Sequence, residues 1–428
     1  MEVEFLGGAG EIGRSAVLID DSLLLDYGMA STSPPQYPVG TVNPDAVVVS
    51  HGHLDHAGAV PSLLSGSDRP PIHWTPPTRD LTLTLAADTL KLHGQTPRCP
   101  FTNNDVRRVT EVSETHSYQE SFTAAGYEVT LFNAGHIPGS AHVLVDDSEV
   151  QRTSDTQSDD GATRLLYTGD FHTDSQRLVD ATTARPDADA VICESTYSDV
   201  AHETRSSVEE SFVETLRTTV WQGGTVVVPA FAIGRTQEIM LVCAAHDIDC
   251  YVDGMGQRVT EQLRHHPDFL RDGDALRGAT ANARFVDGRD GQRRRIADQN
   301  TVIVTTSGML SGGPAMTYIP AIRDRPVNTI AMTGYQVEGT PGRDLLDTGS
   351  AEIDGRVMPV SAQVELFDFS AHADRAGLLS FLSAYRDSEV LVTHGDRCGA
   401  FAEELRSDGY DASAPELGDT VTIQSPRS

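Results

Sequence analysis

The chain has 428 residues, of which 39% are hydrophobic, and it carries a formal net charge of −30. This length predicts two or three domain-sized units, and the absence of a stretch of about 18 apolar residues excludes a membrane span. The segment MEVEFLGG lacks the basic and apolar parts of a signal peptide, so we expect a cytoplasmic protein. The five cysteines form no CxxC pair, which argues against a disulfide framework.

The charge also bears on the source and on possible partners. Lys91 is the only lysine, and the remaining basic side chains are arginines. Abundant carboxylates with arginine in place of lysine favour a protein from a high-salt cytoplasm, although an ordinary acidic protein is the alternative. Nucleic-acid binders usually carry a basic face, so nucleic-acid binding here would depend on local arginines, metal ions and backbone donors.

The first half of the chain reads as short strands with two helices. In chain order we expect strands at Val3–Leu6, Ala16–Asp20, Leu23–Asp26 and Ala46–Ser50, a helix at Leu81–Leu92, strands at Tyr127–Phe132, Ala141–Val145 and Arg164–Thr168, and a helix at Val208–Val220 capped by Ser206 or Ser207. The polar segment Asp146–Gly161 predicts a solvated loop. Strands at Thr225–Pro229, Thr301–Thr305 and Thr329–Met332, with a helix at Arg235–Ala245, then suggest alternating α/β structure.

A glycine pattern near the start resembles a dinucleotide-binding fingerprint but fails its structural condition. Gly8, Gly10 and Gly13 spell GxGxxG after a strand, and such a fingerprint must open a helix. The segment Ser15–Asp20 reads as another strand, so we do not expect a nucleotide site.

The strongest chemical signal is the motif His51-Gly-His53-Leu-Asp55-His56, which follows an apolar strand. Imidazole nitrogens and carboxylate oxygens are typical zinc ligands. The spacing of His51 and His53 lets both rings converge from an extended loop, and Asp55 and His56 can then face a second metal.

The HxHxDH motif resembles the metallo-β-lactamase superfamily, which requires further ligands after later strands. Asn133-Ala-Gly-His136 and Tyr167-Thr-Gly-Asp170 match them. The resemblance implies that His136 binds the first metal and that Asp170 bridges both. His142 competes with His136, but the motif favours His136. Asp26 matches an aspartate that orients the histidine loop.

Later motifs resemble the β-CASP family within this superfamily. Val191-Ile-Cys-Glu194, Phe369-Ser-Ala-His372-Ala-Asp374 and Leu391-Val-Thr-His394 carry the likeness, and the second resembles the nuclease subunit of the cleavage and polyadenylation factor and its prokaryotic relatives. The resemblance implies an α/β fold, a metallo-β-lactamase αββα sandwich with an inserted β-CASP domain. The implied division is 1–198 and 346–428 for the metallo-β-lactamase domain and 199–345 for the β-CASP domain.

The resemblance implies a complete catalytic site with two zinc ions. His51, His53, His136 and Asp170 would bind one zinc, and Asp55, His56, Asp170 and His394 the other. His372, held by Glu194, would be the general acid, and Asp55 is also counted as catalytic. Arg235, Ser307 and Gly308 lie in motifs that recur in the family, and we expect them to bind flanking phosphates.

The expected function is hydrolysis of RNA to 5′-phosphate and 3′-hydroxyl ends, by internal cleavage. A histidine at the position of His394 is associated with RNA-directed members of the family. The alternatives are a 5′→3′ exoribonuclease, a DNA nuclease, a small-molecule hydrolase and a non-catalytic scaffold. A homodimer or an RNA-processing complex is a possible assembly. The histidines without motif support are interpreted as bystanders: His73, His93, His116, His172, His202, His246, His265 and His266.

Overall fold

The protein divides into two compact units. A computed structural model describes residues 1–30, 32, 34–94, 96, 99–148, 162–289 and 291–424. Unit 1 comprises Met1–Ser175, Ala181–Ala201 and Ala371–Ser428, and unit 2 comprises Gln176–Asp180 and His202–Ser370. The chain therefore leaves unit 1 and later returns to it, which is the topology of an inserted domain.

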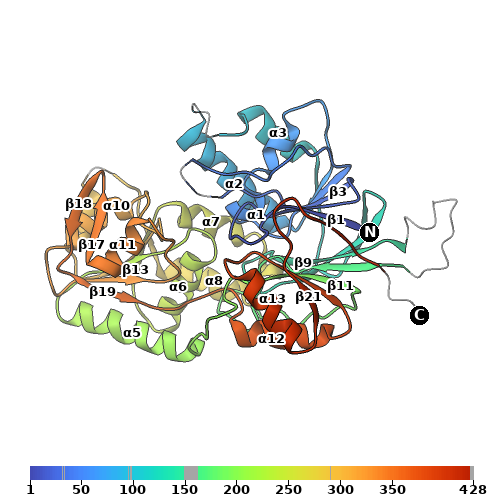
Figure 1. Cartoon of the computed structure of the whole chain (residues 1–428). Helices are drawn as coiled ribbons and strands as arrows, with labels where there is room; N and C mark the ends of the chain where they lie inside the picture. Colours follow the sequence, from blue (N-terminus) through green and yellow to red (C-terminus); the bar gives the residue numbers. More distant parts are fainter. Residues whose placement is uncertain are drawn as a thin grey trace. The chain divides into compact units, whose positions relative to one another are not determined.

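Two sheets form the centre of unit 1 (Figure 1). The first has the order β22-β1-β2-β3-β4-β5-β6 and the second the order β21-β20-β11-β10-β9-β8-β7. The first sheet consists of β1 (Glu2–Gly7), β2 (Ala16–Ile19), β3 (Leu23–Leu25), β4 (Ala46–Val48), β5 (Ile72–Trp74), β6 (Ser113–Thr115) and β22 (Thr420–Thr422). The second consists of β7 (Ser121–Ala124), β8 (Tyr127–Asn133), β9 (Ala141–Asp146), β10 (Arg164–Tyr167), β11 (Ala190–Glu194), β20 (Glu389–Thr393) and β21 (Asp411–Ser413).

Apolar side chains from both sheets fill the space between them. Phe5 and Val17 of the first sheet belong to one buried cluster with Leu131, Ile192 and Leu391 of the second. Alternation along each strand directs the other side chains outward, so each sheet has a second apolar face that helices must cover.

Helices cover the two outer faces. In the described part of this unit the helices are α1 (Leu54–Ala57), η1 (Val60–Leu64), α2 (Pro76–His93), α3 (Asn103–Glu111), α12 (Arg375–Leu382), η3 (Ser383–Tyr385) and α13 (Cys398–Ser407). Trp74 and Val109 belong to the cluster outside the first sheet, while Phe381 and Phe401 pack with Val191 outside the second. The layers are therefore αββα, which confirms the predicted fold class.

Unit 2 is built on a parallel sheet of order β14-β13-β15-β12-β16-β19. Its strands are β12 (Val226–Pro229), β13 (Cys250–Asp253), β14 (Arg284–Phe285), β15 (Val302–Thr305), β16 (Thr329–Met332) and β19 (Gln363–Leu366), with a separate hairpin of β17 (Ser350–Ile353) and β18 (Arg356–Pro359). Its helices are α5 (Arg205–Trp221), α6 (Arg235–Ala245), α7 (Met255–Leu263), η2 (Pro267–Phe269), α8 (Gly273–Asn282), α9 (Gln292–Ala297), α10 (Ala315–Ile322) and α11 (Pro341–Thr348). Parallel strands need crossover connections, and helices supply them.

The expected elements are present, with differences at their ends. Strand β3 stops before Asp26, whose φ of 59° turns the chain out of the extended conformation. The cap of α5 is neither Ser206 nor Ser207: the Thr204 side chain accepts a hydrogen bond from the Ser207 N–H, and the helix begins one residue later. In the expected loop at Asp146–Gly161, residues 149–161 lie outside the described part of the chain.

The division between the units also differs from the sequence-based boundaries at its second position. We expected the return at residue 346, whereas unit 2 continues to Ser370. The reason is that β19 pairs with β16 in the inserted sheet, with Gln363 opposite Thr329. Within the described residues, no helix has the length and apolar character needed to cross a bilayer.

Candidate metal centre

The motif from His51 to His56 lies at the carboxyl end of β4, in a loop that closes into helix α1. The chain after β3 holds this loop in place, because the Tyr27 N–H donates a hydrogen bond of 2.8 Å to the carbonyl oxygen of His56. A Cβ at Gly28 would collide with the carbonyl oxygen of Asp55. Only glycine fits where these two backbone segments meet.

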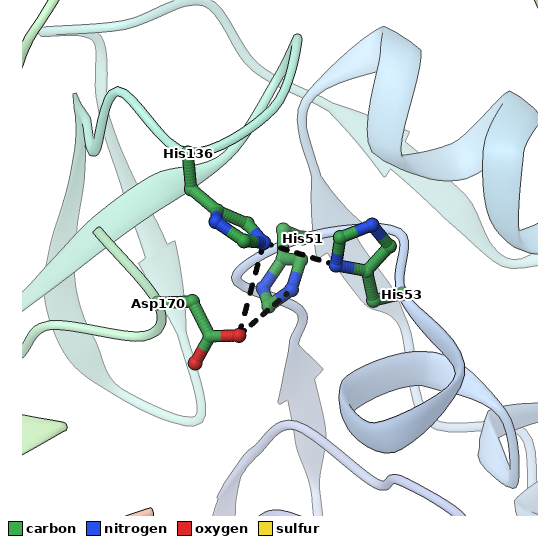
Figure 2. Close-up of side chains that lie close together, drawn as sticks. All are labelled: His51, His53, His136 and Asp170. Carbon is green, nitrogen blue, oxygen red and sulfur yellow. Dashed lines mark hydrogen bonds and ion pairs between the residues drawn. The ribbon is translucent and has the colours of Figure 1, made fainter. Parts of the chain in front are cut away.

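The first donor set gathers His51, His53, His136 and Asp170, whose ligand atoms lie within 4.8 Å of one another. Figure 2 shows the three rings and the carboxylate converging. Nε2 of His136 lies 3.0 Å from Nδ1 of His53 and 3.8 Å from Oδ2 of Asp170, and Nε2 of His51 lies 3.5 Å from that oxygen. His136 follows β8 and Asp170 follows β10, so the second sheet brings these two side chains to the loop of the first.

The second donor set consists of Asp55, His56, Asp170 and His394, again within 4.8 Å. Oδ1 of Asp170 lies 3.1 Å from Nε2 of His56 and 3.5 Å from Nε2 of His394, and the His394 nitrogen lies 3.7 Å from Oδ2 of Asp55. Asp170 therefore offers one oxygen to each set, which is the arrangement expected of a carboxylate that bridges two cations.

Hydrogen bonds on the far side of two rings determine which nitrogen faces each set. Nδ1–H of His136 donates to the carbonyl oxygen of Ala371 at 2.8 Å, and Nδ1–H of His56 donates to Oδ2 of Asp26 at 2.7 Å. In the neutral rings the lone pair is then on Nε2, the atom that faces Asp170. Such partners on the far nitrogen are typical of metal-binding histidines.

Asp26 organises this loop from behind. Its Oδ1 accepts the Ser50 N–H at 2.6 Å, and its Oδ2 accepts hydrogen bonds from the Ser50 hydroxyl at 2.7 Å and the Tyr167 hydroxyl at 2.8 Å. Because Ser50 gives its hydrogen to Asp26, its oxygen accepts from Nδ1–H of His51, 3.1 Å away. The sequence indicated Asp26, but Ser50 and Tyr167 carry no motif signal for this role.

The donor atoms of both sets fit divalent cations. Nε2 of His51 and Oδ1 of Asp170 are buried and make no hydrogen bond of acceptable geometry within the described residues, a deficit that costs about 1–3 kcal/mol per group. Burial lowers the pKa of His51 and His136 well below the ordinary value, so these rings are neutral. Neutral imidazoles and carboxylate oxygens are the ligands that suit zinc.

The ring of His56 lies where neighbouring carboxylates stabilise a positive charge. Burial opposes protonation of this ring, but the carboxylates of Asp170 and Asp26 outweigh it and raise the pKa of His56 well above its usual value. Burial also opposes ionisation of Asp170, but the imidazoles of His394 and His56 hold the pKa of its carboxyl well below the usual range. A cation bound here would replace the proton, because metal ligands must be deprotonated.

His372 lies beside the donor sets and is held by Glu194. Nδ1 of His372 is 3.1 Å from Oε2 of Glu194, and its Nε2 is 4.0 Å from Oδ2 of Asp170. Burial disfavours the charged ring, but Glu194 and then Asp170 outweigh it and raise the pKa of His372 to about 9. The His372 side chain is 20% exposed.

Two further features of the sequence, His142 and the GxGxxG segment, lie close to the donor sets. His142 lies in β9 and is fully buried, with Nδ1–H donating to the Thr168 carbonyl and Nε2 2.9 Å from the Thr182 hydroxyl. This confirms that His142 packs in the strand. The GxGxxG segment is followed by strand β2, as expected, and its Gly8 carbonyl accepts the His394 N–H at 2.6 Å. The glycine segment therefore supports a donor residue.

The residues expected to bind flanking phosphates lie in unit 2, at one edge of its sheet. Arg235 begins α6 after β12, and Ser307 and Gly308 follow β15, the adjacent parallel strand. The guanidinium of Arg235 lies 6.0 Å from the centre of the Phe369 ring. The carboxyl ends of parallel strands are the usual location of ligand sites in α/β sheets.

Comparison with known families agrees with this architecture. Residues 9–193 match the metallo-beta-lactamase superfamily, residues 236–345 match the Beta-Casp domain, and residues 357–415 match the Zn-dependent metallo-hydrolase RNA specificity domain. The first match includes residues of both donor sets, and the third includes His394 of the second set.

Similar proteins extend over nearly the whole chain. RNase aCSPSF2 of Saccharolobus solfataricus is 34% identical over 98% of this chain and 85% of its own length, and Probable RNase MJ4 of Methanocaldococcus jannaschii is 31% identical over 99% and 100%. Transcription termination factor FttA of Pyrococcus horikoshii is 31% identical over 98% of this chain and 70% of its own. A crystal structure of an Enterococcus faecalis protein of unknown function covers 98% of the chain with a TM-score of 0.59 at 11% identity, a likeness of fold alone.

Proposed function

Because the chain belongs to the β-CASP family of the metallo-β-lactamase superfamily, we propose that it is a zinc-dependent ribonuclease. It hydrolyses phosphodiester bonds of RNA and leaves 5′-phosphate and 3′-hydroxyl ends. The observation that carries this proposal is the pair of donor sets sharing Asp170, with His372 held by Glu194 beside them.

Two zinc ions are assigned to the donor sets. His51, His53, His136 and Asp170 would hold one ion, and Asp55, His56, Asp170 and His394 would hold the other. When bound, the ions supply Lewis acidity and lower the pKa of water from about 15.7 to about 7. The Asp55 side chain is 30% exposed and lies 3.7 Å from Nε2 of His394, which supports assigning it a role in orienting the attacking water as well as in binding metal.

The leaving 3′-oxygen needs a proton, and we assign its donation to His372. Glu194 keeps Nδ1 of His372 protonated and turns Nε2 towards the donor sets. A positioned general acid contributes about 10²–10⁴-fold to the rate. In the expected reaction, water attacks the phosphorus atom, the bond to the 3′-oxygen breaks, and His372 transfers its proton to that departing oxygen.

RNA is the substrate that the available observations favour over DNA. Two relatives are named RNases, and the region that contains His372 and His394 matches a domain described by its RNA specificity. A small-molecule hydrolase would need no inserted domain such as unit 2, whereas an extended nucleic-acid substrate gives that domain a role.

The five cysteines are all free thiols, which fits an enzyme of the reducing cytoplasm.

Arg235, Ser307 and Gly308 are assigned to phosphates flanking the scissile bond. A guanidinium can engage two phosphate oxygens at once, and a glycine turn offers backbone N–H donors. A Cβ at Gly308 would come within 3.0 Å of the Phe231 backbone nitrogen, so this turn lies against the loop that precedes α6. The two phosphate-binding segments are thus neighbours.

The function is tested with RNAs labelled at either end, with the 5′ end either blocked or carrying a free monophosphate. Internal cuts on blocked RNA are expected, with 5′-phosphate and 3′-hydroxyl products, and Asp170→Asn serves as the inactive control. Release of mononucleotides only from RNAs with a free 5′ monophosphate would show that the enzyme is an exonuclease and not an endonuclease. No cleavage of any RNA by the zinc-loaded protein would reject the proposal, and equal cleavage of matched DNA would reject its RNA selectivity.

A further inference from the structure

A second cluster of imidazoles lies at the edge of the first sheet of unit 1, among residues that no sequence motif indicated. His73 is in β5, Glu114 is its paired residue in the edge strand β6, and His116 follows that strand. Nδ1 of His73 lies 3.0 Å from Nε2 of His116 and 3.7 Å from Oε2 of Glu114. The three side chains thus present ligand atoms within 4.8 Å of one another.

The spacing matches that of the candidate metal centre. There, the distances between the ligand atoms given above run from 3.0 Å, between His136 and His53, to 3.8 Å, between His136 and Asp170. The cluster at β5 and β6 has separations of 3.0 and 3.7 Å. Zinc lies about 2.0–2.2 Å from such nitrogen and oxygen ligands, so one ion fits among atoms with these separations.

The surroundings keep both rings neutral and fixed in orientation. Phe122 stacks on His116 with 3.6 Å between ring centroids and 9° between planes. Burial lowers the pKa of His73 to about 4 and also lowers the pKa of His116. Two neutral rings whose nitrogens face each other share at most one proton, while the Glu114 carboxylate adds a third electron-pair donor.

A hydrogen bond between the two rings is the simpler explanation of their contact, but it does not account for the position of Glu114. The Glu114 carboxylate approaches the same pair of nitrogens although its side chain is 57% exposed and free to turn to solvent. A cation among the three atoms accounts for this convergence.

We propose that His73, Glu114 and His116 form a third metal site, separate from the candidate catalytic centre, that binds a zinc-like divalent cation. Two imidazoles and one carboxylate suit zinc, nickel or copper and not magnesium or calcium, which prefer all-oxygen sites. The exposed side of Glu114 leaves room for water as a further ligand. This inference does not depend on the proposed ribonuclease activity.

The position of the site connects it with the catalytic loop. The carbonyl oxygen of His73 accepts the N–H of Val49 at 2.9 Å, two residues before His51. At the end of the same strand, the Thr75 hydroxyl donates to the carbonyl oxygen of Gly139 at 2.8 Å, close to His136. A cation that joins β5 to the edge strand β6 therefore stiffens the strand against which two loops of the candidate centre are anchored.

The test measures bound metal in four purified full-length proteins: wild type, His116→Gln, Asp170→Asn and the double variant. Each is stripped with chelator, reloaded with zinc, dialysed and analysed by elemental mass spectrometry. We expect wild type to bind one equivalent more than His116→Gln, and Asp170→Asn to bind one equivalent more than the double variant. The second comparison isolates the new site, because Asp170 belongs to both sets of the candidate centre.

Two further variants keep the test decisive. Glu114→Gln changes an exposed side chain with little effect on packing, and it is expected to weaken retention of the extra equivalent. His265→Gln removes an exposed histidine of unit 2 and should retain the wild-type amount. Equal zinc content with and without His116, in both backgrounds and with unchanged circular dichroism, would show that the two rings share only a hydrogen bond. If the wild type bound this additional zinc equivalent but cleaved no RNA, the result would reject the proposed ribonuclease activity and leave the third metal site supported.

Discussion

Both carboxylate oxygens of Glu194 face the same nitrogen, Nδ1 of His372, at 3.2 and 3.1 Å. The carboxylate is itself held, because Oε1 accepts the Phe171 N–H at 2.7 Å and Oε2 accepts the Thr196 hydroxyl at 2.6 Å. Glu194 is thus a fixed support that both orients and charges the His372 ring.

Replacing His372 by alanine is expected to lower turnover by about 10²–10⁴-fold, the usual contribution of a general acid, while zinc content stays at the wild-type level. Single-turnover cleavage and elemental analysis of the same sample measure both quantities. Loss of zinc in this variant would mean that His372 is a metal ligand and that its assignment as the acid is wrong.

The Glu194→Gln variant separates positioning from proton donation. The amide keeps the shape of the side chain but removes the negative charge that stabilises protonated His372, so a smaller loss than in His372→Ala is expected, together with a shifted pH profile. A profile identical to that of the wild type would indicate that Glu194 only packs against the ring.

The pH dependence follows from the raised pKa of His372. The ring acts in its protonated form, so activity is present below its folded-state pKa and is lost as the pH rises through that value. Without cations the pKa is about 9, against an ordinary 6.5, and nearby cations lower it by repulsion. An alkaline decline in kcat/KM with a midpoint between these values is expected for the wild type. The same decline in His372→Ala would assign it to another group.

Removing one carboxylate at a time should distinguish the two donor sets. Asp170→Asn weakens both, so it is expected to retain two zinc equivalents fewer than the wild type and to have no detectable activity. Asp55→Asn affects only the second set and should retain one equivalent fewer. Dialysis against a chelator followed by zinc readdition provides the control for unfolding. Equal losses from the two variants would contradict the bridging role of Asp170.

Asp26 tests the support behind the loop. Asp26→Asn removes the charge that accepts Nδ1–H of His56, and a loss of about 10–100-fold in metal affinity or activity is expected. Tyr167→Phe is the matched control, because it removes a single hydrogen bond to the same carboxylate. Zinc competition against a chromogenic chelator measures both variants, and a larger effect from Tyr167→Phe would contradict the proposed role of Asp26.

The net charge of −30 predicts stability that depends on salt. Repulsion among exposed carboxylates is screened to about 3 Å at 1 M salt, so the melting temperature should rise with KCl concentration. Thermal unfolding followed by circular dichroism in KCl and in matched sucrose separates screening from solute exclusion. A melting temperature that does not change between low and molar KCl would reject adaptation to a high-salt cytoplasm.

Much of the fold could be predicted because the evidence for it is local. The buried runs of β2, β4 and β12 appear in the sequence as apolar segments bounded by turn residues. Strand ends could not be predicted in the same way: at the end of β3, the side chain of Asp26 accepts hydrogen bonds from Ser50, a contact with a distant residue. The end of unit 2 was likewise decided by the pairing of β19 with β16, a long-range contact with no local signal.

The sequence alone indicated the donor residues that the structure brings together, because His51 to His56 form a contiguous motif and the later motifs resemble a family in order and spacing. Tertiary structure alone decided which nitrogen of each ring faces a donor set, that each oxygen of Asp170 serves a different set, and that His73 meets His116. These facts arise from contacts between residues more than 40 positions apart in the sequence, made by strand pairing within the first sheet and by the packing of the two sheets against each other. Short-range residue patterns carry no information about the partners that such pairing brings together.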